Sequence, residues 1–356
     1  MSVSYKFPTT LTLAVLVSLI CVTAGAAQSY TVRTFASGTG VSGTSPDSVT
    51  FGLGSVWVSY QNGADSTGLF GASTVVRYSP SGTVQNTWSI AGNVDGLRID
   101  PSGQVWALQN NDGNSTLTVI NPTTLATTPY TYGSSYTNVP NRGFDDVVFL
   151  KSGTFLSETN PASNSDPIVL QLTSGLSSPL QVSGILNSQF TGTNLATGVV
   201  GTDTISDSDS LIRTPKGDLA LTGEADGQVV FIHNPGAFNQ SQSFLNLLDV
   251  HGNPIGAKVD DTAYATGTAG YFLMTDTGAN TVYKIYANGL TPGSAFVDVG
   301  TEFGSLDLTT GIVTPIFTGI SPHGLEFVPT PEPGTLVMFA SGLVGLGGML
   351  RRKLSL

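Results

Sequence analysis

The chain has 356 residues and a formal net charge of −11, and charged side chains make up only 10% of it. Nucleic acid is therefore not expected as a partner, because neutralising phosphates needs a dense basic face. The 43 glycines, with many Ser, Thr, Val and Asn residues, favour short strands and tight turns over helices. The length allows one large all-β body with a signal at each end.

The first 26 residues are typical of a cleaved secretory signal peptide. Lys6 precedes an apolar run from Leu11 to Val22, and Ala24-Gly25-Ala26 offers the small-x-small site of a signal peptidase, with Ala24 and Ala26 as its small residues. The run is shorter than the roughly 20 residues of a spanning helix, which makes a retained anchor the weaker interpretation. Cys21 is the only cysteine and follows Ile20, where a lipoprotein signal would have a small residue. We therefore expect an exported protein without a thiol.

A turn followed by an alternating strand recurs six times in the body, residues 27–329. The segments read PDSVTF, VDGLRI, FDDVVF, SDSLIR, VDDTAY and PHGLEF, and their second positions lie 48, 50, 64, 51 and 63 residues apart. A four-stranded propeller blade with its loops fits this spacing. The second positions hold, in chain order, Asp47, Asp95, Asp145, Asp209, Asp260 and His323.

Further strands follow each of these segments. LIRTPKGDLALTGEADGQVVFIHNPG and TAYATGTAGYFLMTDTGANTVYKIYANG both predict a meander of hairpins, in which Gly and Asn take the positive-φ positions. The strands resemble NHL and gluconolactonase-like propeller repeats. The resemblance implies a β-propeller, and the six repeated segments predict six blades, or seven if residues 160–205 or 290–320 hold a degenerate blade. An array of β-sandwiches is the rival fold. PHGLEFVP is expected to close the ring together with the N-terminal strand SYTVRTFA.

If each repeated segment is the innermost strand of a blade, its second residue lies at one mouth of the channel. The six residues would then form a site for Ca²⁺ or another divalent cation, which binds several oxygen ligands at once. The competing interpretation is that each Asp caps its own turn. His323 is the candidate general base or metal ligand, but no catalytic residue is assigned. The resemblance to gluconolactonases implies a channel metal held by Glu, Asn and Asp, and Glu158 and Glu224 do not match those roles.

A platform for stacking sugar rings could be formed by Trp57, Trp88 and Trp106 with Tyr60 and Tyr78. However, Trp57 and Trp106 occupy matching positions in the second strands GSVWVSY and GQVWALQ. Matching positions in a repeat favour packing in the core over sugar binding.

The tail, residues 330–356, has three elements in a fixed order. Pro331-Glu332-Pro333 precedes an uncharged stretch, residues 335–350, and Arg351, Arg352 and Lys353 follow it. Prolines hold an extended segment, the apolar stretch is predicted to form a transmembrane helix, and basic residues prefer the cytoplasmic side. We therefore expect the body outside the membrane and the basic end inside.

This tail resembles the PEP-CTERM protein-sorting domain. The resemblance implies processing by an exosortase-type membrane enzyme after passage through the secretion machinery. It also implies a protein that is membrane-anchored first and then at the cell surface or extracellular, often associated with exopolysaccharide or biofilm matrix.

Two functions fit these predictions. The first is a non-enzymatic surface or matrix protein whose body binds polysaccharide or an envelope protein. The alternative is a metal-dependent propeller hydrolase, lactonase or lyase, which needs a metal-loaded acidic site with a base in reach. A passive spacer is a third interpretation.

Overall fold

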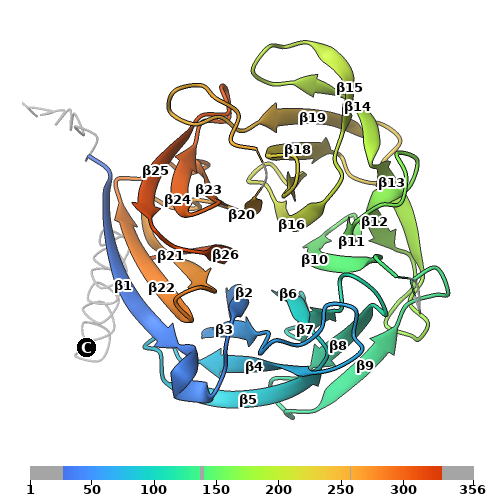
Figure 1. Ribbon diagram of the computed structural model, residues 1–356, viewed down its shortest axis with the longest axis vertical. Coiled ribbons are helices and arrows are strands. Elements are labelled where there is room, and N and C mark those ends of the chain that lie inside the picture. Colours follow the sequence, from blue (N-terminus) through green and yellow to red (C-terminus); the bar gives the residue numbers. More distant parts are fainter. Residues whose placement is uncertain (1–26, 137–139, 257, 331–356) are drawn as a thin grey trace, which may run out of the picture.

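Short apolar segments ended by tight turns form 26 strands in the residues that the computed structural model describes, 27–136, 140–256 and 258–330. The strands assemble into six sheets around a central axis (Figure 1). The body is thus a six-bladed β-propeller, as predicted, and the described residues hold no seventh sheet. The helical content of these residues is one 3₁₀ turn, η1 (Gly38–Val41).

The first three blades are meanders of four consecutive antiparallel strands, each counted from the axis outwards. Blade 1 contains β2 (Pro46–Gly52), β3 (Ser55–Tyr60), β4 (Ala72–Tyr78) and β5 (Val84–Ala91). Blade 2 contains β6 (Val94–Ile99), β7 (Val105–Gln109), β8 (Thr116–Ile120) and β9 (Thr127–Thr131). Blade 3 contains β10 (Gly143–Leu150), β11 (Gly153–Thr159), β12 (Pro167–Leu172) and β13 (Val182–Asn187).

Blade 4 accounts for the long interval between the third and fourth repeated segments. Its meander consists of β16 (Ser208–Arg213), β17 (Leu219–Gly223), β18 (Gln228–His233) and β19 (Ser241–Asn246). A hairpin of β14 (Gln189–Asn194) and β15 (Val200–Thr204) pairs with the outer strand β19 and gives a six-stranded sheet. The extra residues therefore enlarge a blade instead of adding one.

Blades 5 and 6 are interleaved, which the sequence did not indicate. Blade 5 contains β20 (Val259–Tyr264), β23 (Ala295–Val299), β24 (Glu302–Leu306) and β25 (Val313–Thr318). Blade 6 contains β26 (Pro322–Pro329), β21 (Ala269–Asp276), β22 (Thr281–Asn288) and β1 (Ser29–Ser37). The predicted meander from β20 through β21 and β22 is therefore wrong. After β20 the chain crosses to the next blade, forms two strands there and returns.

The N-terminal strand closes the ring. β1 pairs with β22 along the outer edge of blade 6, in the same sheet as the last strand, β26. SYTVRTFA and PHGLEFVP thus share a blade, as expected. One blade built from both ends of the body holds the circle together and leaves no open gap between the first and last strands.

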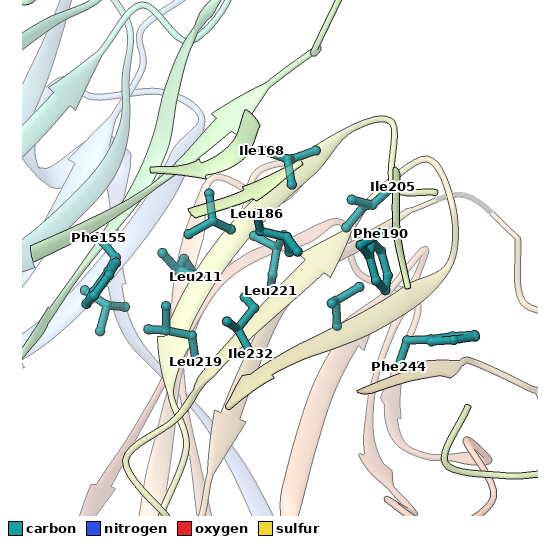
Figure 2. Packing of buried hydrophobic residues seen from close by; sticks show 13 residues of the cluster. Phe155, Ile168, Leu186, Phe190, Ile205, Leu211, Leu219, Leu221, Ile232 and Phe244 are labelled. Atoms are coloured by element: carbon teal, nitrogen blue, oxygen red, sulfur yellow. The ribbon is translucent and has the colours of Figure 1, made fainter. Parts of the chain in front are cut away.

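Apolar side chains fill the space between adjacent blades. Figure 2 shows Phe155 and Ile168 of blade 3 in one cluster with Leu211, Leu221 and Ile232 of blade 4. Trp57 is fully buried between blades 1 and 2 and stacks on Trp88 at 5.4 Å. Trp106 is buried as well. The tryptophans therefore belong to the core, as their matching positions predicted.

The predicted signal peptide, the Pro-Glu-Pro motif and the predicted tail helix lie outside the described residues. Within residues 27–136, 140–256 and 258–330, no helix combines the length and the apolar character needed to span a membrane.

Candidate acid ring at the channel mouth

An irregularity in every innermost strand positions the candidate site. In β2, for example, Pro46 pairs with Tyr60 and Val49 with Val58, so two residues of β2 face one residue of β3. The same shift recurs in β6, β10, β16, β20 and β26. Such β-bulges turn side chains out of the regular ladder. Here they place the second residues of the six repeated segments around one end of the channel.

The structure brings the six predicted residues together. His323 Nδ1 lies 2.6 Å from Asp260 Oδ2 and 3.5 Å from Asp47 Oδ1. A small hollow is lined by the carboxylates Asp47, Asp95, Asp145, Asp209 and Asp260. We call these five residues and His323 the acid ring.

Neighbouring amides and hydroxyls hold part of the acid ring. Gln61 Nε2 donates to Asp95 Oδ1 at 2.8 Å, and Asn111 Nδ2 donates to Asp145 Oδ1 at 2.9 Å. Thr159 donates to the other oxygen of Asp145. Side chains from outside the repeated segments thus orient the carboxylates of Asp95 and Asp145. No three acidic, imidazole or thiol side chains of the described residues are placed to ligate one ion together.

Burial and mutual repulsion raise the pKa values of most of these carboxyls. Burial is the main cause for Asp47, whose pKa lies well above its ordinary value, and the charge of Asp95 adds to it. Burial and the charge of Asp112 raise the pKa of Asp95 to about 7. Burial acts to raise the pKa of Asp260 too, but the charge of His323 together with hydrogen bonds to Asp209 and His323 outweighs burial and lowers that pKa. The carboxyls of the acid ring therefore have too little positive charge nearby to balance their full ionisation.

His323 carries the positive charge inside the ring. The charge of Asp260 outweighs the effect of burial and raises the pKa of His323 to about 10. At neutral pH the imidazole is therefore protonated. A protonated imidazole has no lone pair for accepting a proton or binding a metal, so the prediction of His323 as general base or metal ligand does not fit its observed environment.

In four of the six repeated segments the side chain of the third residue links one blade to the next; the other two segments have Gly96 and Gly324 at this position. Asp146 Oδ2 of blade 3 accepts from Leu211 N of blade 4 at 3.1 Å, and Asp261 Oδ2 of blade 5 accepts from Leu325 N of blade 6 at 2.7 Å. Ser48 Oγ of blade 1 accepts from Leu97 N of blade 2 at 3.0 Å. Because these oxygens are already bonded to the backbone, Asp146 and Asp261 stabilise the ring of blades more than they add ligands to its mouth.

A hydroxyl on the second strand bridges two blades at three equivalent positions. Ser157 donates to Asp209 O at 2.8 Å, Thr222 to Asp260 O at 2.7 Å and Thr275 to Asp47 O at 2.5 Å. In blade 5 this position holds Asp298, whose Oδ1 accepts from Asp261 N at 2.5 Å. Its Oδ2 is buried without a hydrogen-bond partner. Burial, with the charge of Asp260, raises the pKa of Asp298 well above its ordinary value.

Asp298→Thr is therefore expected to stabilise the protein at pH 8. Threonine restores the hydroxyl that the equivalent positions use and removes a buried acid of which one oxygen, Oδ2, has no hydrogen-bond partner, a change of about 1 to 3 kcal/mol. Thermal unfolding of the purified variant measures the effect. The reverse change, Thr222→Asp, serves as the control and should lower the melting temperature. A lower melting temperature for Asp298→Thr would contradict this account.

The opposite mouth of the channel is wider and was not predicted. A cavity of about 610 Å³ opens there, lined mainly by apolar residues such as Phe51, Phe149 and Phe327. Four charged residues line it: Asp100 and Arg213, and on the inner strands Arg98, paired with Asp146 at 2.6 Å, and Glu326, whose pKa is raised by burial. Arg98 and Glu326 are the two that come from matching positions. Both occupy the fifth position of a repeated segment, where the others have Thr50, Val148, Ile212 and Ala263. A comparison of the fifth positions of the six repeated segments would have identified Arg98 and Glu326 as unusual charged residues.

Residues 329–353 match the model of the PEP-CTERM protein-sorting motif. This confirms the prediction made from Pro331-Glu332-Pro333, the apolar stretch and the basic end. The motif implies an exported, surface-sorted protein. It covers the tail alone and carries no statement about the body.

The body is similar in fold to several solved structures. Virginiamycin B lyase from Staphylococcus aureus is 12% identical, with 83% of this chain and 92% of that chain covered and a TM-score of 0.49. Periplasmic gluconolactonase from Pseudomonas aeruginosa is 17% identical, with coverage of 80% and 89% and a TM-score of 0.45. At this level of similarity neither activity passes to this chain. A search of curated proteins finds no match.

Proposed function

We propose that this protein is exported, sorted to the cell surface through its PEP-CTERM tail, and binds a divalent cation at the acid ring. In this proposal residues 1–26 are the signal peptide, residues 27–329 the binding body and residues 330–356 the sorting tail. An exosortase-type enzyme processes the tail, whose residues 335–350 cross the membrane.

The observation that carries the cation site is the charge of the acid ring. Five carboxyls converge at one mouth with a single imidazolium among them. Full ionisation at neutral pH would leave a buried excess of negative charge, which a protein neutralises with protons or a cation. Because no three acidic, imidazole or thiol side chains of the described residues are placed to ligate one ion together, the proposed ion would keep part of its water shell, as Mg²⁺ and Ca²⁺ can.

Titration calorimetry of the purified protein tests this proposal. At pH 8 we expect Ca²⁺ or Mg²⁺ to bind with release of protons, and Asp209→Asn to weaken binding at least tenfold. Asp166→Asn removes the same charge outside the ring and should leave the affinity unchanged. Absence of heat with either ion, or equal effects of the two variants, would remove the acid ring from consideration.

Catalysis by a metal-dependent hydrolase, lactonase or lyase is the alternative. It needs a group that accepts a proton near neutral pH. His323 is held as an imidazolium, and Glu158 is buried in an ion pair with Arg142 at 2.5 Å. Binding without catalysis is therefore the role that these side chains support better.

Polysaccharide or envelope-protein binding remains a proposal of lower support. Trp57, Trp88 and Trp106 are buried, as are Tyr60 and Tyr78. In the described residues the well-exposed aromatic side chains are Phe70, Phe238 and Tyr286, which come from different blades. A stacked sugar platform has no support from this arrangement, and a partner would contact polar loops instead.

A further inference from the structure

The two ends of the channel belong to two different faces of the body. Each inner strand runs from the acid ring towards the wide cavity, so the loops after it lie at the cavity end. Loops between third and fourth strands lie at the same end, since neighbouring strands alternate in direction. We call this surface the exit face. It consists of residues 53–54, 79–83, 100–104, 121–126, 151–152, 173–181, 214–218, 234–240, 265–268, 289–294 and 307–312.

The sorting tail leaves the body from the exit face. The last strand, β26, is an inner strand and ends beside the cavity that Phe327 lines. Thr330 N then donates to Ala269 O at 3.1 Å, at the start of β21. Only residues 331–334 separate Thr330 from the apolar stretch, and four extended residues span at most about 14 Å. While the tail crosses a membrane, the exit face is therefore close to the bilayer and the acid ring faces away from it.

Exposed apolar side chains stand on loops of the exit face in four consecutive blades. Leu53, Leu125, Leu176 and Phe238 are exposed by 50%, 47%, 39% and 109%. Leu53 and Leu125 have φ values of 54° and 63°. Glycine and asparagine adopt this left-handed conformation more readily than leucine. Among the residues that the structure describes, seven of the twelve non-glycine residues with positive φ are asparagines. Folding alone does not account for exposed leucines at these turns.

The two faces differ in their balance of charged side chains. Lys151 and Lys216 are exposed on the exit face, and Arg213 at the end of β16 is exposed beside them. The three acids of the same face all have partners: Asp100 accepts from Trp106 Nε1, Asp307 accepts from Thr310, and Asp218 Oδ2 lies 2.8 Å from His233 Nδ1. Loops around the acid ring instead carry Asp65, Asp112, Asp166, Asp207, Glu224, Asp226 and Asp249, with Arg142 and Lys258 as the cations.

We propose that the exit face contacts the membrane that the tail spans. Leu53, Leu125, Leu176 and Phe238 enter the interface between headgroups and acyl chains, and Lys151 and Lys216 contact anionic headgroups. The acid ring then points away from the bilayer towards its ligand. The inference rests on the membrane anchoring in the proposed function, because the tail brings this face to the lipid.

Spin labels on the full-length exported chain test the contact. The chain without its predicted signal peptide has no cysteine, so Leu53→Cys and Phe238→Cys each provide one labelling site. Phe70→Cys and Val250→Cys are matched controls, exposed by 66% and 51% on loops around the acid ring. The protein is reconstituted into vesicles of phosphatidylcholine and phosphatidylglycerol. Collision with oxygen, which dissolves in lipid, is compared with collision with a water-soluble nickel chelate.

We expect the ratio of oxygen to nickel accessibility to be several-fold higher at positions 53 and 238 than at positions 70 and 250. Equal, water-like ratios in protein that floats with the vesicles would overturn the membrane contact alone. Protein that does not float with the vesicles would overturn the anchoring premise and the contact with it. Mutual spin broadening at position 53 with low access to both reagents would indicate a second copy of the chain instead of lipid, and would also overturn the proposal.

A pair of variants separates membrane contact from folding. Leu53→Asn with Leu125→Asn should raise the melting temperature, because asparagine suits the left-handed turns, while it lowers the oxygen accessibility of a label at position 238. Leu69→Asn removes a leucine of 76% exposure from a loop near the acid ring and should change neither lipid exposure nor orientation. A label at position 238 that is unaffected by the double variant would count against the leucines as membrane contacts.

Discussion

In the presence of a chelator, the protein is expected to be several kcal/mol more stable at pH 5 than at pH 8, the reverse of ordinary acid unfolding. Burial raises the pKa of Asp95 and of Asp261 to about 7. The folded protein therefore holds these protons more tightly than the unfolded chain does. The stabilisation is complete below about pH 4, the ordinary pKa of Asp, and is lost as the pH rises through 7.

His323 acts in the same direction at higher pH. The charge of Asp260 raises the pKa of His323 to about 10, so the stabilisation from its ion pairs is present below about pH 6.5 and lost as the pH rises through 10. The raised pKa of Asp95, and likewise that of Asp261, contributes about 4 kcal/mol to the pH dependence of the free energy of unfolding. Together these groups predict a steady loss of stability from pH 5 upwards.

Chemical unfolding in a denaturant series from pH 4 to 9 measures this profile. Asp95→Asn imitates the protonated acid and should flatten the loss between pH 5 and 8, whereas Asp166→Asn should leave it intact. Adding Ca²⁺ or Mg²⁺ at pH 8 should recover much of the lost stability, because an ion that binds only the folded state stabilises it by mass action. Stability that rises from pH 5 to 8 without metal would refute the description of the ring as buried and short of positive charge.

Replacing Pro331, Glu332 and Pro333 together by alanine should abolish sorting in a host that has the processing enzyme. The protein should accumulate as a longer, membrane-retained form, because the apolar stretch still inserts while the recognised motif is gone. Membrane fractionation and intact-mass measurement of the released protein give the readout.

Two controls make the tail experiment specific. Pro161→Ala changes a loop proline of the body and should leave processing unchanged. In a host without the processing enzyme, the wild-type protein should itself remain in the membrane at full length. Normal release of the triple variant would contradict the role assigned to the tail, whereas release of wild type without the enzyme would point to another protease.

Local sequence was sufficient to locate the six inner strands and the members of the acid ring. Each inner strand begins with a bulge, and a bulge with an acidic second residue leaves the same short pattern wherever it occurs. That pattern is contained in six consecutive residues, such as VDGLRI or FDDVVF. The tail was readable for a similar reason, since its three elements are consecutive in the chain.

Strand pairings between segments distant in the chain could not be predicted from the sequence. β20 pairs with β23 and not with β21, the next strand in the chain. Both β21 and β23 are short apolar strands of similar pattern. The residues of β20 therefore do not determine which of these two strands pairs with it. The same limit applies to β14 and β15, whose sequence would equally fit part of a seventh blade.

By itself the sequence determined an exported all-β chain of six similar units, with one ring of acidic second positions and a sorting tail. Only the tertiary structure decided that blades 5 and 6 exchange strands, that Arg98 and Glu326 meet in a wide second mouth, and that His323 is held as a cation by Asp260 and Asp47. The physical reason is that turn and strand patterns depend on neighbouring residues. The charge of a side chain, and the face on which it is displayed, depend on groups that the fold brings to it from other blades.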